Sequence, residues 1–187
     1  MAEVKGVLLN AVLSFLGERF GEEALDKAIA NLSPSDRVLL PTVILASNWY
    51  AYSAWGPVRR LTAALSQGKD PDLGIEMGKF NASYVFGGVY KSLLIKDPAK
   101  LVKKFSWMHD FFYRDGLSLE TELPGEGGCW LRYRYADDAK PARSTCISTM
   151  GFWIRTIELA GGSNVTAQHT KCRAQGYELC EYRIEWE

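Results

Sequence analysis

The chain has 187 residues, and its 22 basic and 22 acidic side chains give a formal net charge of zero. A chain of this length folds as one compact domain without a disulfide framework. Because Lys and Arg form no long run and no stretch approaches the ~20 apolar residues of a membrane span, we expect neither nucleic-acid binding nor a transmembrane segment.

Apolar residues at helical spacing predict that the first half of the chain is helical. Ser33 and Asp97 each precede a proline, as residues that cap a helix N-terminus do. Gly56-Pro57 must bend or interrupt one helix, and Gly87-Gly88 weakens another unless a second backbone packs closely there. The expected helices cover about residues 7–20, 22–32, 34–41, 49–66, 73–95 and 98–115.

The second half alternates in the manner of strands. Residues 117–123 and 129–135 are predicted strands, a helix follows over residues 144–160, and residues 165–170 and 179–186 are two further strands. The sequence therefore predicts one α+β domain over residues 1–187, with a helical N-terminal half followed by a β-β-α-β-β antiparallel four-stranded sheet.

Four potential metal ligands lie in these last elements. Alternation along the strands turns His169 and Cys180 to the apolar side, and Cys146 begins the buried stripe of the helix. Cys172 lies in the turn between the last two strands. Thiolates and imidazoles are the ligands that zinc prefers, but buried Cys is also a common core residue, so spacing alone leaves both interpretations open.

A family resemblance favours the metal. The segment from Cys146 to Phe152, then His169-Thr170-Lys171-Cys172, and finally Cys180 resemble the 4-vinyl reductase domain, which also forms the sensor half of phenol-responsive transcription activators. The intervals between the four candidate ligands match those sensors, although the sensors have Glu at the place of His169. The resemblance implies a structural zinc site formed by Cys146, His169, Cys172 and Cys180.

A second resemblance concerns the N-terminal half. Residues 5–23 are similar to the opening helices of haem nitric-oxide-binding (H-NOX) domains, which share a superfamily with TRAPP vesicle-tethering subunits. The whole chain is most similar to a paralogous family abundant in myxobacteria. The resemblance implies an H-NOX/TRAPP-like fold in which residues 1–45 form an N-terminal helical part with a possible dimer face. Residues 46–187 would then be the ligand-binding part.

Haem is not expected from the sequence, because the chain has only two His residues and lacks the Tyr-x-Ser-x-Arg motif of the H-NOX domains. The phenol sensors bind their ligand in an aromatic pocket, and the resemblance places a corresponding pocket near a few side chains here. These ligand-binding candidates are Trp107, His109, Tyr113, Trp130 and Phe152. The alternative interpretation is that these aromatic residues simply fill the core.

The predicted function is a non-catalytic domain that senses or binds a small apolar or aromatic ligand, contains a structural zinc and signals through an unidentified partner protein. The alternative is a homodimeric assembly adaptor resembling TRAPP subunits. An enzyme is the weakest hypothesis, because a zinc ion with four protein ligands leaves no position open for substrate. The N-terminus predicts an amphipathic helix rather than a signal peptide, and we expect a cytoplasmic protein.

Overall fold

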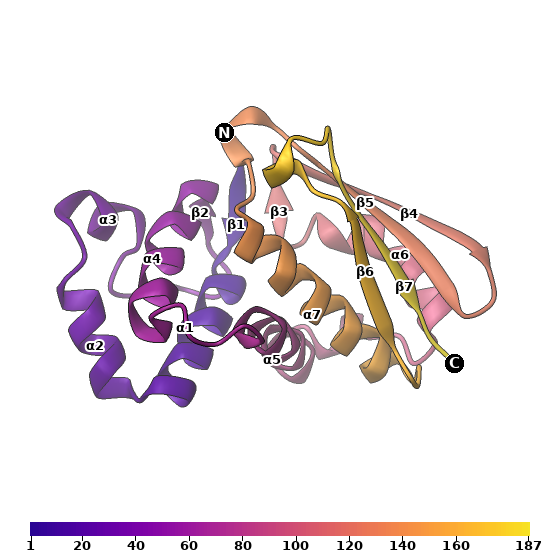
Figure 1. The fold of residues 1–187 in the computed structure, drawn as a ribbon, viewed down its shortest axis with the longest axis horizontal. Coiled ribbons are helices and arrows are strands. Elements are labelled where there is room, and N and C mark those ends of the chain that lie inside the picture. The colour runs from indigo at the N-terminus through magenta and orange to yellow at the C-terminus, as the bar shows by residue number, and fades with distance from the viewer.

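A computed structural model describes residues 1–187 as an α+β fold. Helices α1 to α4 gather at one end of the molecule and a four-stranded sheet forms the other end, with α5 and α7 between them (Figure 1). The helices are α1 (Gly6–Phe20), α2 (Glu22–Ala30), α3 (Pro34–Leu39), α4 (Trp55–Ser66), α5 (Leu73–Gly87), α6 (Pro98–His109) and α7 (Arg143–Ala160).

The large sheet confirms the predicted β-β-α-β-β arrangement. Its antiparallel strands are ordered β4-β5-β7-β6, and α7 connects β5 to β6. Helices α6 and α7 cover the apolar face, while the opposite face carries ion pairs such as Arg132 with Glu181 at 2.7 Å. The strands are β4 (Leu117–Gly125), β5 (Gly128–Tyr135), β6 (Thr166–Lys171) and β7 (Cys180–Glu185).

Helices α5 and α7 cross with their backbones in direct contact. A Cβ atom added to Gly78 of α5 would collide with the carbonyl oxygen of Ser148 in α7, and one added to Gly151 would collide with the carbonyl oxygen of Ile75. Glycine is required at both positions because any side chain would force the helices apart. The close approach is therefore at Gly78, whereas the Gly87-Gly88 pair lies where α5 ends.

Residues 49–54 are not helical, contrary to the sequence-based expectation of one helix over residues 49–66. They form β2 (Trp49–Ala51) and a 3-10 turn, and β2 pairs with β1 (Glu3–Lys5), which in turn pairs with β3 (Tyr113–Arg114). The Lys5 ammonium lies 3.9 Å and the Arg114 guanidinium 3.8 Å from the Trp49 ring centroid. These long-range contacts override the local helical pattern.

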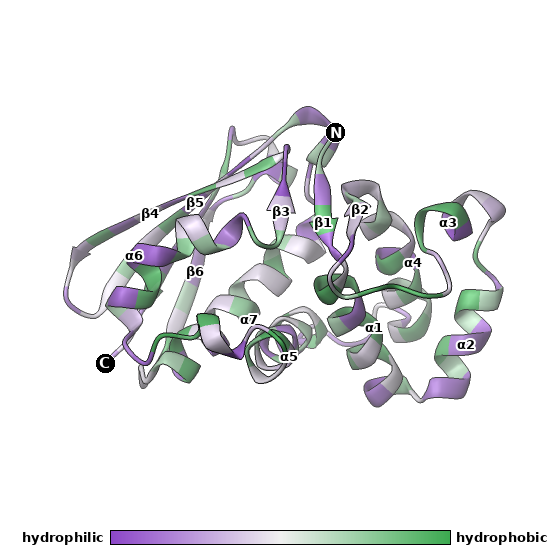
Figure 2. Ribbon diagram, turned by 180° about the vertical axis from the view of Figure 1, so that it is seen from behind, coloured by the Kyte–Doolittle hydropathy of each residue, from purple (hydrophilic) through white to green (hydrophobic).

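Helix α1 is packed inside the molecule against α2, α4 and α5. Its apolar side chains are buried in the main core, so this side of α1 is not free to contact a second copy. The exposed apolar side chains of residues 1–45 include Val38, Val43 and Leu45, and the segment between α3 and β2 is largely hydrophobic in Figure 2. No helix has the length and apolar character needed to cross a membrane.

Candidate functional site

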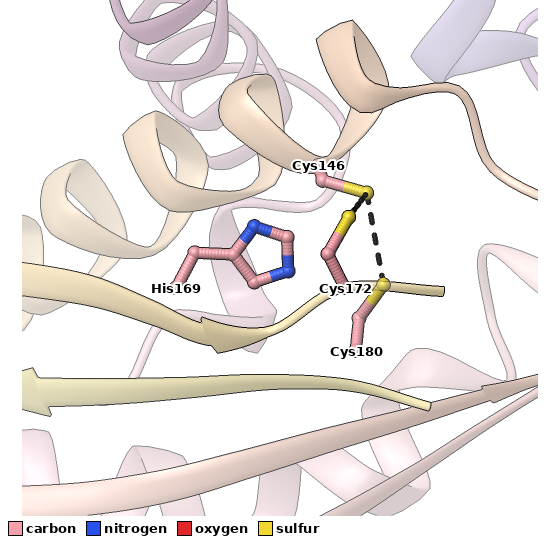
Figure 3. Close-up of side chains that lie close together, drawn as sticks. All are labelled: Cys146, His169, Cys172 and Cys180. Atoms are coloured by element: carbon pink, nitrogen blue, oxygen red, sulfur yellow. Dashed lines mark hydrogen bonds between the residues drawn. The ribbon is translucent and has the colours of Figure 1, made fainter. Parts of the chain in front are cut away.

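Three elements bring the four predicted metal ligands together (Figure 3). Cys146 lies in the first turn of α7, His169 lies in β6, and Cys180 begins β7. Cys172 precedes a short 3-10 turn that ends at Gly176, where φ is +97° and glycine is favoured. The four ligand atoms all lie within 4.8 Å of one another.

Two sulfur–sulfur distances within the Cys3His cluster match those of a tetrahedral metal site. The Cys146 Sγ atom lies 3.6 Å from Cys180 Sγ and 3.8 Å from Cys172 Sγ. Thiolates bound to zinc at ~2.3 Å in tetrahedral geometry are separated by ~3.8 Å. The Cys146 sulfur therefore already has the spacing from the other two sulfur atoms that zinc requires.

The surroundings of the cluster orient His169 and favour a thiolate. The imidazole stacks on Tyr182 with ring centroids 4.4 Å apart, and both of its ring nitrogens are buried without a hydrogen-bond partner. The Arg173 backbone N–H donates to Cys180 Sγ at 3.2 Å. Hydrogen bonds from the Cys146 thiol and from that amide, together with the nearby His169 ring, lower the pKa of Cys180 well below its usual range. Metal binding by this cluster stays a prediction.

A separate cavity of about 380 Å³ lies among α1, α4, α5, α6, α7 and β5. Its volume is within the range of small-molecule sites. Aromatic side chains of α6, β5 and α7 line the cavity, and more polar side chains line it from α4, the α4–α5 loop and the first turns of α7. Arg59 is the only Lys or Arg that lines the cavity, and Asp70, its only carboxylate, already pairs with Arg19 at 3.0 Å.

His109 lines this cavity at the end of α6. Its side chain is 2% exposed, and neither ring nitrogen has a hydrogen-bond partner. Burial lowers the pKa of His109 to about 4, so the imidazole is neutral at pH 7. The Asp110 carboxylate, 3.8 Å from Nδ1, is exposed and forms no ion pair with a neutral ring. The ring stacks on Tyr113 with centroids 4.8 Å apart, leaving a neutral nitrogen ligand without a partner.

The five predicted ligand-binding residues are not all brought together. His109, Tyr113 and Phe152 line the cavity. Trp107 is on the outer side of α6 with 61% of its surface exposed, because it is two residues from His109 and projects away from the core. Trp130 is outside the cavity, since it alternates with the inward residues of β5, and its ring lies under the Arg183 guanidinium.

The side chains that line the cavity and that the sequence patterns did not indicate include Tyr52, Arg59, Tyr133 and Tyr135. The alternation of β5 could have revealed two of them, because Tyr133 and Tyr135 share the inward face with Leu131. No local signal marks Tyr52 and Arg59, which reach the cavity from a turn and a helix distant in sequence.

The architecture can be compared with known proteins. No protein-family model matches the sequence, and no curated protein is found as a relative. An H-NOX protein from Shewanella oneidensis in the Fe(II)NO ligation state superposes with a TM-score of 0.75 at 16% identity, over 98% of this chain and 99% of that one. This chain has the fold of the H-NOX domains.

Two further structures support the same fold. An Fe(II) unliganded H-NOX protein from K. algicida has a TM-score of 0.70 at 16% identity, covering 98% of this chain and 96% of that one. An oxygen-binding H-NOX domain related to soluble guanylate cyclases, in its oxygen complex, has a TM-score of 0.69 at 12% identity, with coverages of 98% and 95%.

The expectation that this chain binds no haem is contradicted by the structures that share its fold. It was based on an absent motif, whereas one such structure is described in an Fe(II)NO state, another as an oxygen complex, and a third by its haem redox potential. The cavity residues also fit such a group. His109 presents a neutral imidazole, the ligand that haem iron accepts from a proximal histidine, and aromatic rings surround it.

Proposed function

We propose that this chain is a non-catalytic small-molecule-sensing domain whose ligand binds in the cavity beside His109. The observation that carries the proposal is the buried imidazole of His109, which lines the cavity and has no hydrogen-bond partner in the protein. A buried polar group without a partner costs stability, and its retention beside a cavity is typical of a binding site.

Haem is the first ligand to consider. His109 would hold the iron through a ring nitrogen, Tyr113 would fix the orientation of the imidazole by stacking, and Phe105 and Phe152 would exclude water from the apolar part of the cavity. When bound, the group would supply an iron centre that binds a diatomic gas. An apolar or aromatic ligand without a metal is the alternative occupant of the same cavity.

The Cys3His cluster contributes a structural zinc in this proposal. Four protein ligands close the coordination sphere, so the metal holds the first turn of α7 to the ends of β6 and β7. The closed cluster offers no position for chemistry. Ligand binding in the cavity would instead be signalled to a partner protein. A cytoplasmic location is consistent with reduced cysteines.

The chain has only two histidines, which allows a matched test. Titration of the purified protein with haemin is expected to give a saturable Soret shift at one haemin per chain. His109→Ala should abolish axial ligation and leave zinc in place, whereas His169→Ala should reduce zinc and leave the Soret spectrum intact. If neither haemin nor naphthalene compounds show saturable binding to the wild-type chain, the proposal is wrong.

A further inference from the structure

A group of tyrosine hydroxyls in the cavity has no partner in the protein. Tyr52 and Tyr135 are buried and Tyr113 is half-buried, and all three line the cavity. None of their hydroxyls forms a hydrogen bond within the chain, whereas the neighbouring Tyr133 hydroxyl accepts a 2.8 Å bond from Trp153 Nε1. Buried tyrosine hydroxyls usually have a hydrogen-bond partner, so these three donors are available to a ligand.

A cation lines the same cavity as these hydroxyls. Arg59 is half-buried on the face of α4 that lines the cavity, and it forms no ion pair or hydrogen bond with any side chain of the protein. Its charge acts on the Tyr52 hydroxyl, and the Tyr52 ring centroid lies 6.5 Å from that of Tyr113. The adjacent Arg60, in contrast, bonds the Asp36 carboxylate away from the cavity.

The part of the cavity lining that comes from α7 is also suited to negative charge. The first turns of α7 bring Ser144, Thr145 and Ser148 to the cavity, and no side chain caps this helix N-terminus. Free backbone N–H groups and the helix dipole favour an anion there. The only carboxylate that lines the cavity is that of Asp70, which Arg19 already neutralises.

We infer that the ligand of this cavity carries a carboxylate, which the Arg59 guanidinium and the hydroxyls of Tyr52, Tyr113 and Tyr135 bind while its apolar body lies beside His109. This inference rests on the proposed function and names its ligand class as aromatic or apolar carboxylic acids. A guanidinium binds a carboxylate through paired charge-assisted hydrogen bonds, and phenol hydroxyls can donate to the remaining oxygen lone pairs. The carboxylate belongs either to haem, as a propionate, or to a free aromatic acid.

Two pairs of probes distinguish a haem propionate from a free acid. Each pair also tests whether the negative charge of the carboxylate strengthens binding. Haemin is compared with haemin dimethyl ester by absorbance, and naphthalene-2-carboxylate is compared with naphthalene-2-methanol by calorimetry. The acid of at least one pair is expected to bind the wild-type chain about 10- to 100-fold more tightly than its neutral analogue, as charge-assisted hydrogen bonds predict. Preference within the haemin pair identifies a propionate, and preference within the naphthalene pair identifies a free acid.

Arg59→Gln should remove this preference by weakening the binding of the acid and leaving that of the neutral analogue unchanged. Arg59→Lys should retain part of the preference. Arg134→Gln is the matched control, because Arg134 lies on the outer face of the sheet and pairs there with Glu120 and Glu178. Thermal unfolding of each variant verifies that it folds. Equal binding of acid and neutral analogue, or an unchanged preference in Arg59→Gln, would overturn the carboxylate inference alone. Failure of all four probes to bind would overturn the proposed function, and the inference with it.

Discussion

The two histidines of this chain are both buried at their ring nitrogens, but they lie in different surroundings. Each has buried ring nitrogens without a partner. Three sulfur atoms lie within 4.8 Å of the His169 ligand nitrogen, whereas His109 lines a cavity of about 380 Å³. A histidine enclosed by other ligands suits a metal that stabilises the fold, and a histidine beside a cavity suits an exchangeable ligand. The following predictions test this division of roles.

The largest effect is expected from removing a ligand of the Cys3His cluster. Cys180→Ser should reduce zinc to less than about half an equivalent per chain and destabilise the fold by about 4 kcal/mol or more, because structural zinc binding contributes directly to folding. Metal analysis and denaturant unfolding measure both effects.

Cys129→Ala is the control for that substitution. Cys129 is a buried thiol of β5 outside the Cys3His cluster, and burial raises its pKa to about 12. This variant should keep its zinc and lose only the packing of one sulfur atom. Equal zinc content in Cys180→Ser and Cys129→Ala would contradict a metal role for the cluster.

The next effect concerns acid stability of the ligand-free protein. Burial lowers the pKa of His109 from 6.5 to about 4, so the unfolded chain takes up this proton at higher pH than the folded chain. The contribution of neutral His109 is fully present above pH 6.5 and is lost as pH falls toward 4. Its size is about 3 kcal/mol. His109→Phe should flatten this part of the stability–pH curve, and parallel curves for wild type and variant would show that the imidazole does not titrate as a buried base.

The smallest effect tests the contact between the two regions, since α7 carries Cys146 of the Cys3His cluster and Phe152 of the cavity wall. Gly78→Ala places a methyl group against the α7 backbone and should cost about 1–3 kcal/mol through overpacking. Gly87→Ala is the matched control, because the added Cβ atom meets no other atom within 4 Å, and it should change stability little. Chemical denaturation measures both, and equal stability of the two variants would mean that the crossing adjusts freely.

The fold was largely predictable because its periodicities are local. The strand alternation from residue 117 onward and the helix from residue 144 predicted the β-β-α-β-β sheet, and the Ser33 and Asp97 side chains cap α3 and α6 as expected, each accepting from a backbone N–H three residues on. The small β2-β1-β3 sheet was missed because its strands have two or three residues and are held by partners far apart in sequence.

The two regions differ in how much of them the sequence could indicate. Three of the metal-ligand candidates, Cys146, His169 and Cys180, lie at positions whose phase in a strand or helix points inward, so pattern alone placed them on the buried side, whereas Cys172 lies in a turn. A cavity is a property of packing among many elements and has no periodicity. Trp107 illustrates the limit, because it shares a helix with His109 but lies on the opposite, exposed side.

Because the two histidines lie in separate regions, the signals of each can report on the state of its own region. Each region contains one of the only two imidazoles in the chain, and each lies against a single stacked tyrosine ring, Tyr182 for His169 and Tyr113 for His109. Isotope labelling of histidine would therefore give a magnetic-resonance spectrum with one signal set for each region. Metal loss and cavity occupancy could then be followed independently, in the same sample and without any substitution.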